Sequence, residues 1–187
     1  MAFIVLEGID GCGKSTHARL LAEWLVKEGR DVVLTAEPTD GKIGVFIREV
    51  LSGRETVDPK TLSMLFTADR YEHLLNRIEP ALAEGKIVVS ERYYYSTIAY
   101  QSAQGVDWNW LFEINKFARK PDLTILLDVK PDEGASRTDT NEIFEKSEFL
   151  AEVRDNYLKF QDVSMVETRR PTGEVQDRIR SIVSDMM

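Results

Sequence analysis

The sequence has a single cysteine, Cys12, so the chain has no second thiol with which to form an internal disulfide. It also lacks long apolar runs, and none approaches the ~18 residues that would span a membrane. Near its start there is no basic stretch followed by a short apolar core, the pattern of a secretion signal. We therefore expect a cytoplasmic protein without a membrane segment.

Positive charge is scarce, because 24 lysines and arginines face 32 aspartates and glutamates, giving a net charge of -8. A protein that neutralises nucleic-acid phosphates usually carries a basic excess or patch, so this balance argues against a nucleic-acid partner. Internal repeats, linkers and low-complexity stretches are absent as well. With 187 residues, 43% of them hydrophobic, the chain is long enough for a full core, and we expect one domain over residues 1–187.

A glycine-rich stretch, GIDGCGKST, follows the apolar run of residues 2–6 and precedes a helical pattern. Its spacing is that of a phosphate-binding loop, whose backbone N–H groups and following helix favour phosphate oxygens. Lys14 would reach the β and γ phosphates, and Ser15 is placed to ligate Mg²⁺. Surrounding N–H groups could lower the pKa of Cys12, although we interpret it as a small residue that the loop tolerates. The predicted nucleotide-binding residues are Gly8, Ile9, Asp10, Gly11, Cys12, Gly13, Lys14, Ser15 and Thr16.

Short apolar runs alternate with helical patterns along the whole chain. The runs predict strands at residues 2–6, 32–35, 87–90 and 123–128, and a weaker one at 163–167. Helices are predicted up to Gly29, at 43–51, from Asp58 to near Gly85 with Pro80 bending its end, within 97–118, at 143–160 and from about Gly173. This alternation predicts an α/β fold with a parallel sheet covered by helices on both faces.

Phe66 and Arg70 lie four residues apart on the predicted long helix, so they share one of its faces. A flat ring beside a planar donor suits a nucleobase, whose face stacks on the ring and whose edge takes hydrogen bonds. Because arginine only donates, Arg70 favours a keto oxygen, such as O4 of thymine or uracil, over the amino group of cytosine. The alternative is that Phe66 packs in the core and Arg70 pairs with a glutamate. We interpret His73, one turn further on, as structural.

The stretch SERYYYSTIAYQ begins where the third strand is expected to end. Ligands of open α/β sheets bind at the carboxyl ends of the strands, so this stretch should lie on the same side as the phosphate-binding loop. Glu91 is a candidate to hold Mg²⁺ or its water, and Arg92 is a candidate to clamp an acceptor phosphate. Four polar side chains that suit a base edge and a sugar follow within a turn of one another: Ser96, Thr97, Tyr100 and Gln101.

A third stretch, TAEPTDGKIGVFIREV, places Glu37 and Pro38 just after the second strand. Arg48 lies off the apolar stripe of the next predicted helix, so it either reaches a ligand or forms a surface salt bridge. A cis bond before Pro38 is compatible with such a turn, and the sequence does not decide it.

The motifs that stand out are the phosphate-binding loop with Asp10, the EP turn at 37–38, F-x-x-x-R at 66–70, [DE]-R-Y at 91–93 and S-T-x-A-Y-Q at 96–101. Together, and in this order over most of the chain, they resemble the thymidylate kinase family. The resemblance implies a three-layer P-loop nucleoside-monophosphate-kinase fold with a five-stranded parallel sheet and a short lid at roughly 134–146. It also implies a homodimer that transfers the γ-phosphoryl group of ATP to dTMP, giving dTDP.

The resemblance also implies roles for individual residues. Phe66 would stack on thymine, Arg70 would bind its O4, and Tyr100 would lie where a 2′-hydroxyl would crowd it. The residues that border the base would be Ser96, Thr97 and Gln101. Those that hold the acceptor phosphate would be Arg48 and Arg92, and those elsewhere in the same pocket would be Glu37 and Pro38. Asp10 would approach the 3′-hydroxyl and the metal region.

Two features depart from the family pattern. The tripeptide usually begins with aspartate, whereas Glu91 adds a methylene group, as in the ERS motif of deoxynucleoside kinases. Family members carry several arginines in the lid or one in the phosphate-binding loop, but here the loop has none and the lid segment offers only Arg137. Arg137 is therefore the candidate that stabilises charge on the transferring phosphoryl group, together with Lys14, Mg²⁺ and Arg92. Both Asp10 and Glu91 remain candidates for the direct Mg²⁺ ligand.

Three alternative functions compete with this one. A deoxynucleoside kinase is disfavoured because its acceptor is neutral, so the two arginines expected to bind an acceptor phosphate would have no phosphate to bind. A kinase for another nucleoside monophosphate would be restricted by Arg70 to keto bases, which leaves dUMP and a keto purine. A nucleotide-dependent switch of the GTPase type would need an N-K-x-D guanine-binding motif, which the sequence lacks.

Overall fold

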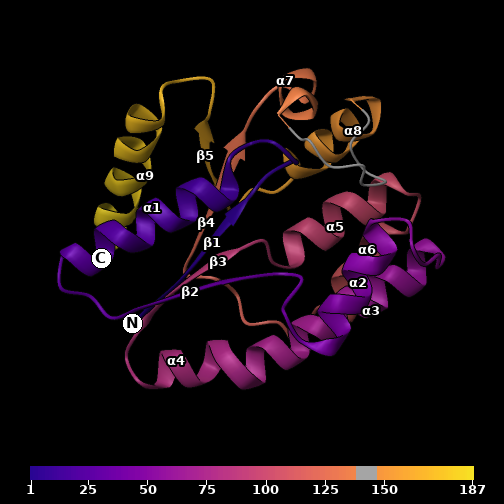
Figure 1. Ribbon diagram of the computed structural model, residues 1–187, viewed down its shortest axis with the longest axis horizontal. Coiled ribbons are helices and arrows are strands. Elements are labelled where there is room, and N and C mark those ends of the chain that lie inside the picture. Colours follow the sequence, from indigo (N-terminus) through magenta and orange to yellow (C-terminus); the bar gives the residue numbers. More distant parts are fainter. Residues whose placement is uncertain (138–146) are drawn as a thin grey trace.

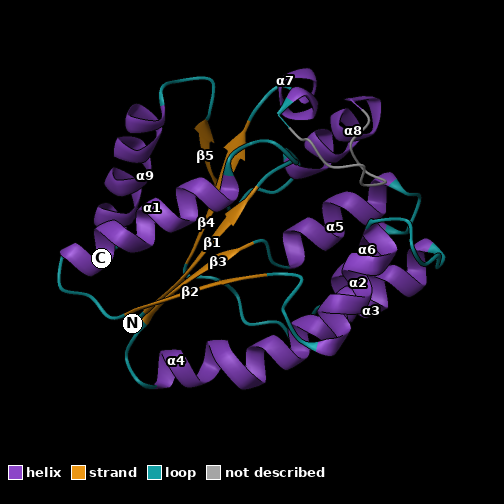
Figure 2. Ribbon diagram, in the orientation of Figure 1, coloured by secondary structure: helices purple, strands orange, loops and turns teal. Residues whose placement is uncertain are grey.

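The computed structural model describes residues 1–137 and 147–187. Strands and helices alternate along these residues as the sequence predicts (Figure 2). In chain order the elements are β1 (Ala2–Glu7), α1 (Lys14–Lys27), β2 (Val32–Ala36), α2 (Lys42–Leu51), α3 (Pro59–His73), the π-helix η1 (Leu74–Ile78), α4 (Glu79–Ala83), β3 (Ile87–Glu91), α5 (Tyr94–Ala103), α6 (Trp108–Ile114), β4 (Leu123–Asp128), α7 (Pro131–Ser136), α8 (Ser147–Tyr157), β5 (Ser164–Glu167) and α9 (Thr172–Met186).

The five strands form one parallel sheet in the order β2-β3-β1-β4-β5. Helices α1 and α9 lie on one face, and η1 with α4 lies on the other, so helices cover both faces (Figure 1). The sheet therefore confirms the predicted fold class, including the weaker fifth strand. Its carboxyl edge lies beside the phosphate-binding loop, residues 8–16, and that is the edge at which ligands of open α/β sheets bind.

The central strand β1 is buried along its whole length. Because successive side chains of a strand point to opposite faces, Ile4 and Leu6 pack in one hydrophobic cluster and Phe3 and Val5 in the other. A strand covered on both faces has a continuous apolar sequence, which explains why the run before the glycine-rich loop predicts a strand.

The helix predicted from Asp58 to near Gly85 is present, but it is not uniform. Asp58 caps it, because its carboxylate accepts hydrogen bonds from the N–H groups of Lys60 and Thr61 at 3.0 and 3.2 Å. The chain then widens into the π-helix η1 immediately before α4, which contains Pro80. Proline has no N–H to donate to the fourth residue before it, so a wider turn at this point accommodates the break in the hydrogen-bond ladder.

Several boundaries differ from the sequence prediction. Helix α5 begins at Tyr94 rather than at residue 97, and the short helix α7 was not predicted at all. Of the lid expected at 134–146, residues 134–137 close α7, and the remainder lies outside the described residues. The predicted helix at 143–160 corresponds to α8 from residue 147 onward, and its first four residues lie outside the description. No helix within the two described ranges has both the length and the apolar character to cross a membrane.

The unpredicted helix α7 packs directly on the phosphate-binding loop, backbone against backbone. A Cβ atom added to Gly134 would lie 2.6 Å from the carbonyl oxygen of Asp10. A Cβ atom added to Gly11 would lie 2.1 Å from the carbonyl oxygen of Gly134. These distances are shorter than atoms tolerate, so glycine is required on both sides of the contact.

We predict that Gly134→Ala destabilises the protein. Overpacking costs about 1–3 kcal/mol, and the better helix propensity of alanine, worth up to about 1 kcal/mol, is gained in the helical control Gly173→Ala as well, so Gly134→Ala should be about 1–3 kcal/mol less stable than that control. Urea unfolding checks the free energy of unfolding. The matched control is Gly173→Ala in the first turn of α9, where a Cβ would meet nothing within 4 Å. Equal unfolding free energies for the two variants would contradict the proposed backbone contact.

Candidate active site

The phosphate-binding loop has the backbone that its glycines allow. Gly8 has a φ of 143°, and a Cβ there would lie 2.5 Å from the carbonyl oxygen of Leu127. Lys14 spans the loop, because its Nζ donates to the carbonyl oxygen of Ile9 at 2.8 Å and lies 3.9 Å from Asp10 Oδ1. Cys12 is buried, and this burial raises the pKa of its thiol. The thiol is therefore a neutral packing group. This agrees with the interpretation of Cys12 as a small residue that the loop tolerates.

A hydroxyl and a carboxylate meet where β3 ends beside the start of α1. Ser15 Oγ donates to Glu91 Oε1 at 2.9 Å. These two oxygens lie next to the loop that is predicted to hold phosphates, and hard oxygen ligands are those that Mg²⁺ prefers. Within the described parts of the chain, no group of three or more acidic, histidine or cysteine side chains converges on one point. Any divalent ion bound here would therefore need a nucleotide phosphate to supply some of its ligands.

Arg92 follows β3 with an unusual backbone. Its φ is 65°, and among the described residues it alone has a positive φ without being glycine. Its N–H donates to the carbonyl oxygen of Leu6 at 2.9 Å, and the hydroxyl of Ser90 donates to its carbonyl oxygen at 3.0 Å. This conformation turns the side chain back over the phosphate-binding loop, where Nη1 lies 3.4 Å from the carbonyl oxygen of Gly8. A strained backbone held by its surroundings is characteristic of functional sites.

Asp10 forms an ion pair with Arg92 through Arg92 Nη2. The hydroxyl of Tyr100 donates to the other oxygen of Asp10 at 2.8 Å. Burial raises the pKa of the Asp10 carboxyl, but the charges of Arg92 and Lys14 and the Tyr100 hydrogen bond outweigh it, so the net shift is downward. Asp10 is therefore ionised near neutral pH and engaged on both oxygens, whereas Glu91 faces Ser15.

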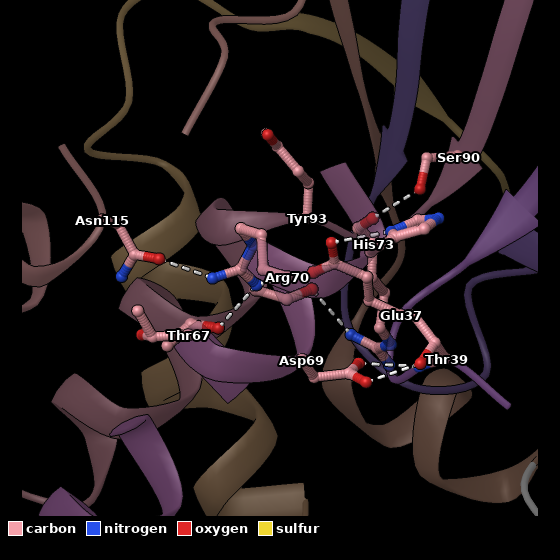
Figure 3. Close-up of polar contacts among 12 residues, drawn as sticks. Glu37, Thr39, Thr67, Asp69, Arg70, His73, Ser90, Tyr93 and Asn115 are labelled. Carbon is pink, nitrogen blue, oxygen red and sulfur yellow. Dashed lines mark hydrogen bonds and ion pairs between the residues drawn. The ribbon is translucent and has the colours of Figure 1, made fainter. Parts of the chain in front are cut away.

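Arg70 is buried at the other end of the site, and its guanidinium is almost fully engaged. It forms an ion pair with Glu37 at 2.7 Å and donates to Asn115 Oδ1 at 2.6 Å and to Thr97 Oγ1 at 3.0 Å. Figure 3 shows Arg70 between Asn115 on one side and Glu37 with His73 on the other. The sequence left open whether Arg70 pairs with a glutamate or faces a ligand. It does pair with a glutamate, and it also lines the cavity described below.

His73 connects this network to the sheet. Its Nδ1 lies 3.1 Å from Glu37 Oε1, and its Nε2 lies 2.7 Å from Thr35 Oγ1. The ring is buried, which agrees with the structural role expected for it. Glu37 is thus held from two sides, by His73 and by Arg70, so the position of Arg70 is fixed before any ligand binds.

The EP turn is held by Arg48. Its guanidinium donates to the carbonyl oxygens of Thr39 and Pro38, both at 2.6 Å, and Nη2 lies 3.2 Å from Asp40 Oδ1. The peptide bond between Glu37 and Pro38 is cis. The sequence left open whether Arg48 forms a surface salt bridge or reaches a ligand. It forms a surface salt bridge with Asp40, and its side chain also lines the cavity.

One cavity of about 600 Å³ collects nearly all of these side chains. Every residue predicted for the acceptor pocket lines it, including Phe66 and Gln101, and so do Lys14, Glu91 and Arg137. Of the predicted nucleotide-binding residues, those that do not line it are Gly8, Ile9 and Cys12.

Sequence reasoning missed some of the residues that build the site. Tyr93, Ala36 and Leu51 also line the cavity. The ring of Tyr93 lies under the guanidinium of Arg70, 5.2 Å away, and this residue stood inside the [DE]-R-Y motif. The sequence gave no indication of Asn115, because it orients Arg70 from the end of α6, 45 residues away.

Arg137 lies at the end of α7, on the rim of the cavity. Its Nη2 is 3.8 Å from Glu133 Oε2, and Glu133 also pairs with Arg169 at 3.0 Å. Its side chain is 43% exposed, so it has room to reorient toward a phosphate.

Comparison with known proteins agrees with this geometry. The family model of thymidylate kinase matches residues 6–179. The chain is 46% identical over 197 residues to the probable thymidylate kinase of Thermococcus onnurineus (strain NA1), covering 97% of this chain and 96% of that protein. It is 48% identical over 170 residues to the probable thymidylate kinase of Pyrococcus horikoshii, covering 86% and 83%, and 42% identical over 181 residues to that of Methanocaldococcus jannaschii, covering 95% and 93%. The chain therefore belongs to the thymidylate kinase family.

Proposed function

We propose that the cavity at the carboxyl edge of the sheet is where this member of the family phosphorylates dTMP to dTDP with ATP. The observation that carries the proposal is that one cavity contains the phosphate-binding loop at one end and the pair formed by Phe66 and Arg70 at the other. Arg92 lies where the two ends meet, because it contacts Gly8 of the loop and Ser96 of α5. Such an arrangement holds a donor phosphate, an acceptor phosphate and a base at once.

Two buried polar atoms support thymine as the base. Arg70 Nε and Gln101 Oε1 have no hydrogen-bond partner, although both residues line the cavity. Buried polar groups are normally paired, so an unused donor and an unused acceptor in residues that line one cavity indicate a ligand edge that offers the complementary groups. The O4 oxygen and the N3–H group of thymine provide such an edge, and Phe66 is available to stack on the ring.

Phosphoryl transfer needs positioning and charge neutralisation more than covalent help. We assign Lys14 to the donor phosphates and Arg92 with Arg48 to the acceptor phosphate. For Arg48 this means exchanging the contacts that now hold the EP turn. Arg137 is assigned to the charge that develops on the transferred group. The acceptor phosphate is already an anion, so no general base is needed.

We assign Mg²⁺ to Ser15 and Glu91. Their oxygens are 2.9 Å apart beside the loop, whereas Asp10 is engaged with Arg92 and Tyr100. When bound, the ion would neutralise charge on the donor phosphates. Asp10 instead balances the charge of Arg92 in the absence of acceptor.

A homodimer is supported by the exposed face of α3 and its continuation. Met64, Tyr71 and Leu75 are each about half exposed and follow one another at helical spacing, and Phe117 packs on Tyr71 with ring centroids 5.3 Å apart. Apolar side chains gathered in this way are typical of a subunit contact. Light scattering should give a mass near twice that of the 21.4 kDa chain, and a monomer at micromolar concentration would refute the dimer.

The cytoplasmic location and the lid at 134–146 stay predictions.

The function is tested by ADP release with ATP and Mg²⁺ in the presence of dTMP, dUMP, dGMP, thymidine or no acceptor. We expect strong turnover with dTMP and little with thymidine, because Arg92 and Arg48 need a phosphate to bind. Turnover with thymidine equal to that with dTMP would instead identify a nucleoside kinase. Hydrolysis independent of any acceptor would identify a nucleotide switch.

The metal assignment predicts different effects for two isosteric variants. Glu91→Gln should raise the Mg²⁺ concentration needed for half-maximal activity by about 10-fold, since it weakens a metal ligand. Asp10→Asn should leave that concentration nearly unchanged and should raise the KM for dTMP. Titration of activity against Mg²⁺ at saturating ATP makes the comparison. If Asp10→Asn shifts the Mg²⁺ requirement and Glu91→Gln does not, the assignment is wrong.

Arg137 is predicted to act on the transferred phosphoryl group rather than on binding. Arg137→Ala should lower kcat by about 10³-fold, the scale of an arginine that neutralises transition-state charge, with KM values little changed. Arg137→Lys should recover only part of kcat, because a lysine keeps the charge but loses the planar fork. Steady-state kinetics separate the constants. A loss confined to KM would make Arg137 a binding residue.

A further inference from the structure

Glu7, the last residue of β1, is a carboxylate inside the core that none of the roles above uses. It is fully buried, and this burial raises the pKa of its carboxyl, against the effect of its hydrogen bonds and of the charge on Arg92. Burying a carboxylate costs free energy unless donors surround it. The contacts of Glu7 therefore indicate what it is for.

Four donors converge on Glu7. The N–H groups of Tyr93 and Ser96 donate to Oε1 at 2.7 and 3.3 Å. The hydroxyls of Ser96 and Tyr157 donate to Oε2 at 2.6 and 2.9 Å. Tyr93 is the N-cap residue of α5, and its own side chain makes no capping bond. Glu7 thus supplies, from a neighbouring strand, the negative group that stabilises the N-terminus of this helix.

These contacts enclose Arg92. The N–H of Tyr93 belongs to the peptide group that follows Arg92, so Glu7 fixes the main chain on the far side of the residue with a φ of 65°. Ser96 Oγ donates to Glu7 Oε2 at 2.6 Å, lies 2.8 Å from the Tyr157 hydroxyl, which also donates to Glu7, and accepts a hydrogen bond from Arg92 Nη1 at 3.0 Å. The carboxylate therefore orients the serine hydroxyl, and the hydroxyl in turn orients the guanidinium.

We propose that Glu7 is a positioning residue for the acceptor phosphate: it holds the backbone of Arg92 and, through Ser96, aims the guanidinium at the phosphate site. This rests on the proposed function, in which Arg92 binds that phosphate. Glu7 itself touches no substrate. Its effect should appear in the part of the binding free energy that comes from the phosphate, and not in the part that comes from the base.

The sign of the effect distinguishes positioning from simple electrostatics. If Glu7 acted only as a nearby negative charge, removing it would strengthen the attraction between Arg92 and a phosphate. If Glu7 positions Arg92, removing it should weaken phosphate binding. The quantity that isolates this term is the ratio of the dissociation constants of thymidine and dTMP, because contacts with the base and sugar cancel in it.

The experiment is calorimetric titration of the full chain with dTMP and with thymidine, without ATP. In Glu7→Gln we expect the ratio to fall by about 10-fold, as when one charge-assisted hydrogen bond is lost. Ser96→Ala breaks the same path while Glu7 keeps its charge and its donors from the Tyr93 N–H and the Tyr157 hydroxyl, and it should lower the ratio as well, which keeps the test open if Glu7→Gln does not fold. The matched control is Asp122→Asn, whose carboxylate accepts from the N–H of Phe3 at 2.7 Å at the opposite end of β1 and should leave the ratio unchanged.

The outcomes separate the two proposals. A wild-type ratio near one would refute the phosphate-binding role of the arginines, and with it the proposed function. A large wild-type ratio that is unchanged or increased in Glu7→Gln and Ser96→Ala would leave that function intact and refute the role of Glu7. Equal weakening of dTMP and thymidine binding also leaves the ratio unchanged, so it too would overturn the positioning role.

Discussion

The ion pair between Arg92 and Asp10 is the contact on which the acceptor side of the site depends. A guanidinium shielded from water is stable only when its charge is paired and its donors are satisfied. Here Asp10 supplies the opposite charge, and the hydroxyl of Ser96 and the ring of Tyr100 surround the remainder of the group. The positive φ of Arg92 is tolerated because these partners determine where the side chain must lie. The site therefore holds its charge in place before a substrate arrives, which is what electrostatic catalysis requires.

The base end follows the same principle with different residues. Arg70 is paired with Glu37, which comes directly after β2, just as Arg92 is paired with Asp10, which comes after β1. Two arginines, the buried Arg70 and the partly buried Arg92, are thus each neutralised by a carboxylate that follows a strand at the same edge of the sheet. The separation of these two carboxylates along the edge consequently follows the spacing of β2, β3 and β1 in the parallel sheet.

Local patterns predicted most of the fold and much of the site. The phosphate-binding loop, the strands and the pairing of Phe66 with Arg70 depend on neighbouring residues, so spacing alone revealed them. The roles of Asn115, Gly134 and Glu7 depend on contacts between segments far apart in the chain, so spacing did not reveal them, although Glu7 directly precedes the phosphate-binding loop and Gly134 lies in the predicted lid. Helix α7 is short, and its apolar residues do not recur at helical spacing, which is why the sequence predicts a lid in this region and no helix. For Arg70 the two alternatives were not exclusive, because one guanidinium both pairs with Glu37 and lines the cavity.

The strand order has a consequence for how the chain is made. Of the five strands of this sheet, β1 is synthesised first and lies at the centre, yet Ala2 pairs with Ile87 and Ile4 pairs with Leu123. One edge of β1 therefore stays open until β3 (Ile87–Glu91) is synthesised, and the other until β4 (Leu123–Asp128) is synthesised. During that interval its open edges are free to pair with other chains. Helix α1, which follows at once, is the first element able to shield one face of β1, so early docking of α1 on β1 would protect the nascent chain from aggregation.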